Sequence, residues 1–195
     1  MKKLKVVLAA GLAGVLLSGC FGGSEPGPNL QAVMARTNAA FQAFENHLQK
    51  NNIQKATDQH MGQFNVFLQR TMNLQPELYK TAIATKLSKD ATFEGFCDAN
   101  ANGQVDQGEK KLFKIEVDAA NKRLIATDAS GESTGRSFSG MGFLAGMLIG
   151  NLMGRQRAAG IAPNSFNNRK MTSPRAYSQS RSRSRARSGG LFRGK

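Results

Sequence analysis

The sequence predicts an α+β fold in which N-terminal helices pack on a small antiparallel sheet, followed by a Gly-rich amphiphilic helix and a disordered basic tail. Three observations support this prediction. Apolar residues early in the chain recur at spacings of three, four and seven, as in helices that bury one face. The period then changes to two, which is typical of strands. The chain ends in a Gly-rich apolar stretch and a long stretch rich in Arg and Ser.

The net positive charge comes from the two ends of the chain. The 195 residues include 27 Lys and Arg against 13 Asp and Glu, for a formal net charge of +14. Residues 1–20 contribute +3 and residues 151–195 contribute +11, whereas residues 21–150 are neutral. The high net charge therefore does not indicate a nucleic-acid-binding domain. Two cysteines and two isolated histidines provide neither a disulfide framework nor a zinc finger.

Residues 1–19 are predicted to be a signal peptide. A Lys-rich start precedes an apolar run over residues 6–17, which is too short to span a bilayer of about 30 Å. The run ends Leu17-Ser18-Gly19-Cys20, and here the chain resembles bacterial lipoprotein precursors with their lipobox. The resemblance implies that Cys20 becomes the mature N-terminus and carries a diacylglycerol thioether and an amide-linked acyl chain such as palmitate. An ordinary secretory signal followed by a chance cysteine is the alternative.

The same resemblance implies a location in the bacterial envelope, facing the periplasm. Several acyl chains anchor a protein stably because each buried CH₂ contributes about 0.8 kcal/mol. Phe21 stands where the inner-membrane retention signal of many lipoproteins has Asp, so we expect the outer rather than the inner membrane. Residues 20–28 are rich in Gly and Pro and are predicted to form a lipidated tether.

Residues 29–138 are predicted to form a small α+β body that begins with helices. Asn29 is expected to cap a helix that ends near Gln49, and a second helical pattern continues to about residue 72. Pro76 suits the first turn of a third helix over residues 77–87. The apolar stripes of the first two helices predict a shared core rather than a ligand groove. These stripes comprise Leu30, Val33, Met34, Phe41, Phe44, Leu48, Ile53, Ala56, His60, Phe64, Phe67, Leu68 and Met72.

Strands are predicted after residue 90. Phe113, Ile115 and Val117 alternate with polar residues, which indicates a strand with one buried face. Residues 118–122 are predicted to turn and residues 124–128 to return as a second strand. Residues 91–97 are predicted to be a third strand.

Residues 98–109 (DANANGQVDQGE) form a motif with candidate calcium ligands. Calcium takes about six to eight oxygen ligands, and in EF-hand loops these fall at positions 1, 3, 5, 7, 9 and 12. With Asp98 as position 1, Gly103 permits the sharp turn at position 6, and Val105 at position 8 is expected to point into the core. The loop resembles the EF-hand calcium loop over all twelve positions. The resemblance implies as ligands Asp98, Asn100, Asn102, the backbone carbonyl of Gln104, Asp106 directly or through water, and Glu109.

The loop also departs from the EF-hand pattern, because strands rather than helices are predicted on both sides and no second loop is present. Similar calcium loops join strands in the β-sandwich repeats of bacterial surface adhesins. That resemblance fits the flanks better and implies a rigid, structural site. A plain turn is the alternative, since Asn, Asp and Gly favour turns. With only three carboxylates in the loop, we expect a dissociation constant of about 10⁻⁴–10⁻³ M.

Residues 139–155 are predicted to form an apolar helix. Gly142, Gly146, Gly150 and Gly154 align on one face, so the segment 142–154 resembles a glycine zipper, in which small residues let helices approach closely in membranes. A helix over residues 141–153 would be about 20 Å long, which is short for a span of about 30 Å. Three roles are open to it, namely lying in the membrane interface, forming a homo-oligomer or packing on the body. A loop-like, Gly-rich segment is the alternative.

Residues 156–195 are predicted to be disordered, because they lack a hydrophobic period and are rich in Arg and Ser. The lipobox places this tract in the envelope, so nucleic acid is not expected as its partner. We expect residues 155–195 to bind anionic lipid or an anionic envelope polymer. A solvated tail without a specific partner is the alternative.

Together these features predict a non-enzymatic, membrane-anchored envelope lipoprotein with one weak, structural calcium site, acting as a structural or binding module. A calcium-responsive EF-hand-type module that regulates partner binding is the alternative. An enzyme is the least supported hypothesis, because the sequence offers no carboxylate pair, nucleophile–base set or metal triad.

Overall fold

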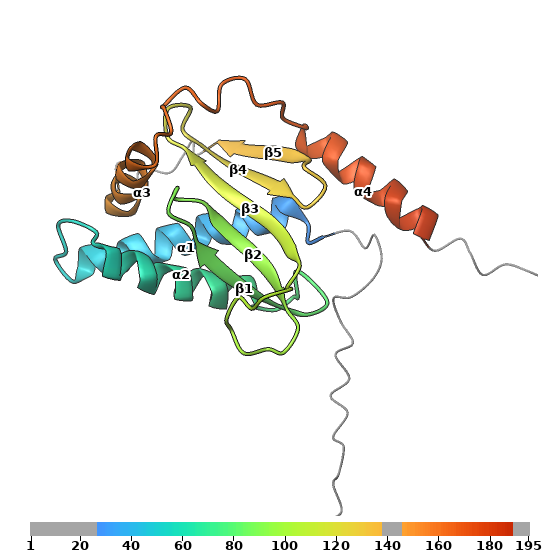
Figure 1. Ribbon diagram of the computed structural model, residues 1–195, viewed down its shortest axis with the longest axis horizontal. Coiled ribbons are helices and arrows are strands. Elements are labelled where there is room, and N and C mark those ends of the chain that lie inside the picture. Colours follow the sequence, from blue (N-terminus) through green and yellow to red (C-terminus); the bar gives the residue numbers. More distant parts are fainter. Residues whose placement is uncertain (1–26, 138–145, 189–195) are drawn as a thin grey trace, which may run out of the picture.

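The computed structural model describes residues 27–137 and 146–188, and the side chains of these residues up to residue 183 (Figure 1). The predicted signal peptide, Cys20, residues 21–26 and Gly142 lie outside the described residues. The fold is α+β, and the N-terminal helices precede an antiparallel sheet as predicted. Its elements are α1 (Leu30–Lys50), α2 (Asp58–Met72), β1 (Ala82–Leu87), β2 (Phe93–Asp98), β3 (Lys111–Asp118), β4 (Arg123–Asp128), β5 (Ser133–Ser137), α3 (Met147–Ala158) and α4 (Pro174–Ser188).

The five strands form one antiparallel sheet in the order β1-β2-β3-β4-β5, so each strand pairs with its neighbour in sequence. Helices α1 and α2 pack against each other and cover one face of this sheet (Figure 1). The register pairs Ile115 of β3 with Phe93 of β2 and with Ala126 of β4. Because the side chains of a strand alternate between faces, this register places all three on the helix-covered face.

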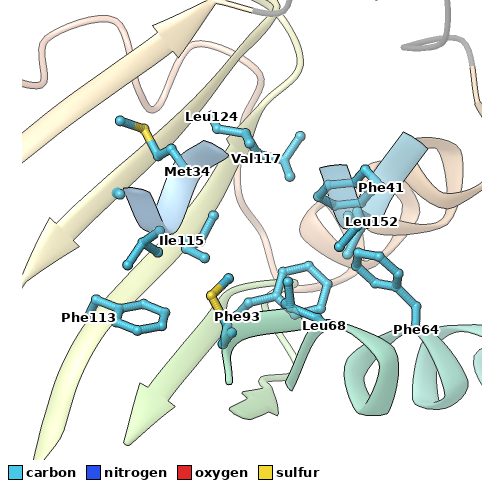
Figure 2. Packing of buried hydrophobic residues seen from close by; sticks show 14 of the residues in the cluster. Met34, Phe41, Phe64, Leu68, Phe93, Phe113, Ile115, Val117, Leu124 and Leu152 are labelled. Carbon is cyan, nitrogen blue, oxygen red and sulfur yellow. The ribbon is translucent and has the colours of Figure 1, made fainter. Parts of the chain in front are cut away.

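The core lies between the two helices and the sheet, and it confirms the predicted stripe of α1 and that of α2 from residue 58 onward. Ile53 and Ala56 were predicted on the second helix but precede it, because α2 begins at Asp58. The Asn29 side chain accepts a hydrogen bond from the backbone N–H of Gln31 at 2.9 Å and so caps α1 as predicted. The rings of Phe41 and Phe64 lie 4.5 Å apart, and Phe64 lies 5.4 Å from Phe93 of β2. Figure 2 shows these aromatic side chains together with aliphatic side chains from β3 and β4. Such burial from several elements stabilises the fold chiefly through the hydrophobic effect.

The predicted helix over residues 77–87 is wrong, because residues 82–87 form strand β1. Polar side chains of α2 and its C-cap bind the outer edge of this strand. The Asn73 side chain accepts from the N–H of Ile83 and donates to its carbonyl, both at 2.8 Å. Gln69 Oε1 accepts from the N–H of Thr85 at 2.9 Å, and Asn65 donates to the carbonyl of Thr85 at 3.0 Å. These bonds satisfy backbone N–H and C=O groups at the outer edge of the sheet. Helix propensity, which depends on neighbouring residues alone, does not include such contacts.

The predicted apolar helix over residues 139–155 is found only in part, as α3, which runs from Met147 to Ala158. Gly146, which was predicted to lie on the glycine face, is instead the N-cap with an extended backbone (φ −66°, ψ 159°). Leu148, Ile149 and Leu152 are buried in the core between α1 and α2, so α3 packs on the body. Gly150 and Gly154 lie on its exposed side. Within the described residues, no helix is both long and apolar enough to cross a membrane.

The C-terminal segment also differs from the prediction of disorder, because residues 174–188 form α4. Before α4 the chain returns along the sheet, where Arg169 contacts both carboxylate oxygens of Glu116 in an ion pair. Glu116 alternates with the core residues Ile115 and Val117, so this contact lies on the sheet face opposite α1. Tyr177 of α4 is only 2 % exposed. Contacts distant in sequence therefore order a segment whose composition is typical of disorder.

Candidate calcium-binding loop

The loop of residues 98–109 connects β2 and β3 as the end of a hairpin. Strand β2 ends at Asp98 and β3 begins at Lys111. The N–H of Cys97 donates to the carbonyl of Lys110 at 2.9 Å and closes the base of the loop. The predicted strands on both sides are confirmed, so the loop lacks the flanking helices of an EF-hand and has the strand-joining setting of the adhesin-type loops.

Asp98 holds the first half of the loop around its carboxylate. It is 4 % exposed. Its Oδ1 accepts from the N–H of Asn102 at 3.1 Å and its Oδ2 from the N–H of Gly103 at 2.8 Å. Gly103 has a φ of 73°, a left-handed conformation that favours glycine. The sharp turn predicted at position 6 is therefore present.

Asp106 and Glu109 hold the second half of the loop. Asp106 Oδ2 accepts from the side-chain amides of Asn100 and Asn102, at 2.8 and 2.7 Å. Glu109 Oε1 accepts from the N–H of Ala99 at 3.2 Å, and its Oε2 accepts from the N–H of Asp106 at 3.0 Å. Glu109 therefore ties the end of the loop to its beginning, as a closing ligand at position 12 would.

The structure thus brings all six predicted ligand residues into one hydrogen-bonded network. Gln104 takes part only through its backbone, because its N–H donates to Asn102 Oδ1 at 2.7 Å and the residue is exposed. In the part of the chain that the structure describes, no group of three or more His, Cys, Asp or Glu residues is arranged to hold a metal ion. The carboxylates of Asp98, Asp106 and Glu109 are instead engaged by N–H donors of the loop.

Two features of the loop differ from, or add to, the prediction. Val105 is half-buried and lies outside the hydrophobic core cluster, so it does not serve as the core anchor that position 8 predicted. The loop is attached to the helical layer through Gln69 of α2, whose Nε2 donates to the carbonyl of Gly103 at 3.0 Å. The same side chain binds Thr85 of β1 through Oε1. Sequence reasoning missed Gln69 because nothing distinguishes it from an ordinary polar residue on a helix surface.

The two histidines have structural environments. His60 completes a capping box with Thr57 at the start of α2, where the N–H of Thr57 donates to His60 Nδ1 at 3.1 Å. His47 is exposed near the end of α1 beside Asn51.

Comparisons with protein-family models, with curated proteins and with solved structures found no match to this chain.

Proposed function

We propose that the protein is a non-enzymatic lipoprotein of the bacterial outer membrane, anchored through lipid on Cys20, whose loop 98–109 binds one calcium ion as a structural clasp. The observation that carries the calcium proposal is the hydrogen-bonded network of the loop, in which Asn100 and Asn102 donate to Asp106, while Asp98 and Glu109 accept from backbone N–H groups of the loop. All five side chains contain oxygen atoms, and oxygen is the ligand that calcium prefers.

The ion would replace hydrogen bonds that now join the loop side chains. Asn100 and Asn102 present amide nitrogen to Asp106. With calcium bound, each amide would present its oxygen instead, because nitrogen of an amide is a donor and does not bind a cation. The carboxylates would then neutralise the charge of the ion. Since the loop closes a hairpin between two paired strands, the expected consequence is a more stable β2–β3 hairpin.

Calcium binding is tested by calorimetry on the mature chain, residues 20–195 with Cys20→Ser. Residues after 138 are kept because Leu148 and Leu152 of α3 belong to the core. The test variant is Asp106→Asn with Glu109→Gln, which removes two ligand charges and keeps side-chain shape. The control is Asp58→Asn with Glu77→Gln, which removes the same charge from exposed positions outside the loop.

We expect the wild type and the control to bind with a dissociation constant of about 10⁻⁴–10⁻³ M, and the test variant to lose binding. At about ten to a hundred times this constant, calcium should add about 1.4–2.7 kcal/mol to the free energy of unfolding. Absence of both heat and stabilisation in the wild type would reduce the loop to a plain turn.

Hydrogen exchange distinguishes the structural role from the calcium-responsive alternative. A structural clasp should increase protection in residues 98–109 and in the paired ends of β2 and β3. A regulatory module should also change protection along α2, which Gln69 connects to the loop. Calcium-induced loss of protection in α2 would therefore favour the alternative.

Lipidation is tested by mass spectrometry of the protein from bacterial membranes. The expected species lacks residues 1–19 and carries acyl groups on Cys20, and globomycin should block its formation. An unmodified Cys20 would contradict the proposal. Cys97 is disulfide-bonded in the structure, so lipidation also requires that Cys20, the other cysteine of the chain, is not its partner in the mature protein. A disulfide between the two would contradict the proposal, because the same sulfur cannot also form a thioether.

The open glycine face of α3 supports a further part of the proposal, that the protein forms homo-oligomers through residues 142–154. Among the residues that the structure describes, a Cβ added at Gly150 or Gly154 would meet no other atom within 4 Å. A second helix can therefore approach this side of α3 closely.

A further inference from the structure

Helix α4 is attached to the body at the point where the N-terminal tether enters it. The guanidinium group of Arg181 donates to the carbonyl of Gly27 and, at 2.9 Å, to that of Pro28. Tyr177, one turn earlier on the same side of α4, is buried in the core cluster. Just before the helix, the N–H of Thr172 donates to the carbonyl of Ser133 in β5 at 2.7 Å. Figure 1 shows α4 projecting from the end of the body at which α1 begins.

The sequence of α4, PRAYSQSRSRSRARS, contains five arginines and no acidic residue. Tyr177 and Arg181 face the body. Residues 175, 179 and 183 fall on the opposite side of a helix with 3.6 residues per turn, and the structure has Arg175, Gln179 and Arg183 exposed. The helix therefore presents basic side chains to the solvent beside the start of α1.

The predicted lipid attachment lies close to this surface. Six residues separate Cys20 from Gly27, and an extended chain advances about 3.5 Å per residue, so a lipid on Cys20 is within about 25 Å of Gly27. The far end of α1 is beyond the reach of this tether, because α1 alone has 21 residues and is about 30 Å long at 1.5 Å per residue.

We infer that α4 is a second membrane-binding element, whose arginines bind the phosphate groups of anionic lipids next to the acyl anchor. The inference deepens the proposed function and rests on it for the position of the membrane. Attachment at two neighbouring points holds the body in one orientation, with the start of α1 toward the lipid and Lys50 away from it. A basic surface and an acyl group together bind a membrane more strongly than either does alone, because both contact the same lipid surface.

The first experiment measures co-sedimentation of the mature chain, residues 20–195 with Cys20→Ser, with lipid vesicles. No acyl group contributes, so this result is independent of lipidation. One variant carries Arg175→Gln and Arg183→Gln. The matched control carries Lys50→Gln and Lys55→Gln, which removes the same charge from exposed positions near the far end of α1. Thermal unfolding verifies that both variants remain folded.

We expect binding to vesicles that contain phosphatidylglycerol, weakening with added salt, and no comparable binding to phosphatidylcholine alone. Each arginine that contacts the anionic surface should contribute about fivefold to the partition coefficient, so the α4 variant should lose about 25-fold and the lysine control much less. An equal loss in the two variants would overturn the inference, and so would equal binding to the two kinds of vesicle.

The second experiment tests the orientation of the acylated protein in vesicles. The chain contains no tryptophan, so a single introduced tryptophan reports one position. Brominated phosphatidylglycerol should quench the fluorescence of Gln179→Trp in α4 more strongly than that of Gln49→Trp at the far end of α1. Equal or reversed quenching would overturn the inference. If Cys20 proves not to be acylated, the proposed anchor fails, whereas the co-sedimentation result still decides whether α4 binds anionic lipid.

Discussion

At the scale of single residues, Asp118 and Asp58 form the same kind of ion pair in very different surroundings. Asp118 pairs with Arg123 at 2.7 Å, and its side chain is 0 % exposed. Asp58 pairs with Arg155 at 2.8 Å, but its side chain is 84 % exposed. The two arginines are about equally exposed, at 24 and 25 %. Burial of the carboxylate is therefore the main difference between the pairs.

We predict that Asp118→Ala lowers the free energy of unfolding by about 3 kcal/mol, because it leaves polar partners of a buried carboxylate unpaired. Asp118 also accepts from the N–H and side-chain amide of Asn121, both at 3.1 Å. Asp58→Ala should cost less than about 1 kcal/mol, because water screens the exposed pair. Urea unfolding of the two variants measures the difference, and equal losses would contradict the prediction.

Gly95 and Gly62 form a second contrasting pair. A Cβ at Gly95 in β2 would come within 2.2 Å of the ring of Phe113, which is 1 % exposed and has little room to move. A Cβ at Gly62 in α2 would meet no atom of the described part of the chain within 4 Å. Gly95→Ala should therefore destabilise the protein by about 1–3 kcal/mol, and Gly62→Ala should stabilise it by about 0.5–1 kcal/mol. Opposite shifts in melting temperature are the expected readout.

At the scale of elements, the attachment of α4 depends on the protonation of Tyr177. Burial raises the pKa of Tyr177 above its ordinary value of 10.0, and smaller effects of Arg181 oppose this shift. The folded chain thus holds the phenol proton more tightly than the unfolded chain. The resulting stability is fully present below about pH 10 and is lost as the pH rises through the raised pKa.

This effect predicts that α4 detaches in alkali. The difference in tyrosinate absorbance between the wild type and Tyr177→Phe should have a midpoint above pH 10, accompanied by loss of helix signal in circular dichroism. A midpoint at or below pH 10 would contradict the burial of Tyr177 in solution.

At the scale of the whole molecule, the C-terminal part of the chain completes the core of the N-terminal part. Leu148, Leu152 and Tyr177 belong to the same hydrophobic cluster as the residues of α1 and α2. Folding of the body therefore involves residues beyond 138, where a boundary was predicted from composition. The glycine face of α3 is exposed, and the proposed homo-oligomer would form through it.

We predict that Gly150→Leu with Gly154→Leu abolishes homo-oligomers without unfolding the body, because leucine fills the space that a second helix would need. The control is Gln42→Leu with Asn46→Leu, which places the same two side chains at the same spacing on the exposed side of α1. Cross-linking in membranes and thermal unfolding provide the two readouts. An oligomer that survives in the glycine variant would refute assembly through this face.

The sequence by itself determined the elements whose burial repeats along the chain. The apolar stripes of α1 and α2 and the alternation in β3 predicted those elements. Each of them packs one face against the core, so its buried residues recur at a regular spacing in the sequence. The strand-flanked loop 98–109 was also evident, since its turn depends on local residues such as Asp98 and Gly103.

The tertiary structure alone decided β1 and the attachment of α4. Strand β1 depends on side-chain bonds from Asn73, and α4 depends on Arg181 reaching Gly27, which lies 154 positions earlier in the chain. Such contacts leave no periodic pattern, because each joins a few groups that are adjacent only after folding. Local propensity therefore favoured a helix at β1 and disorder at α4, and long-range hydrogen bonds and burial overrode both preferences.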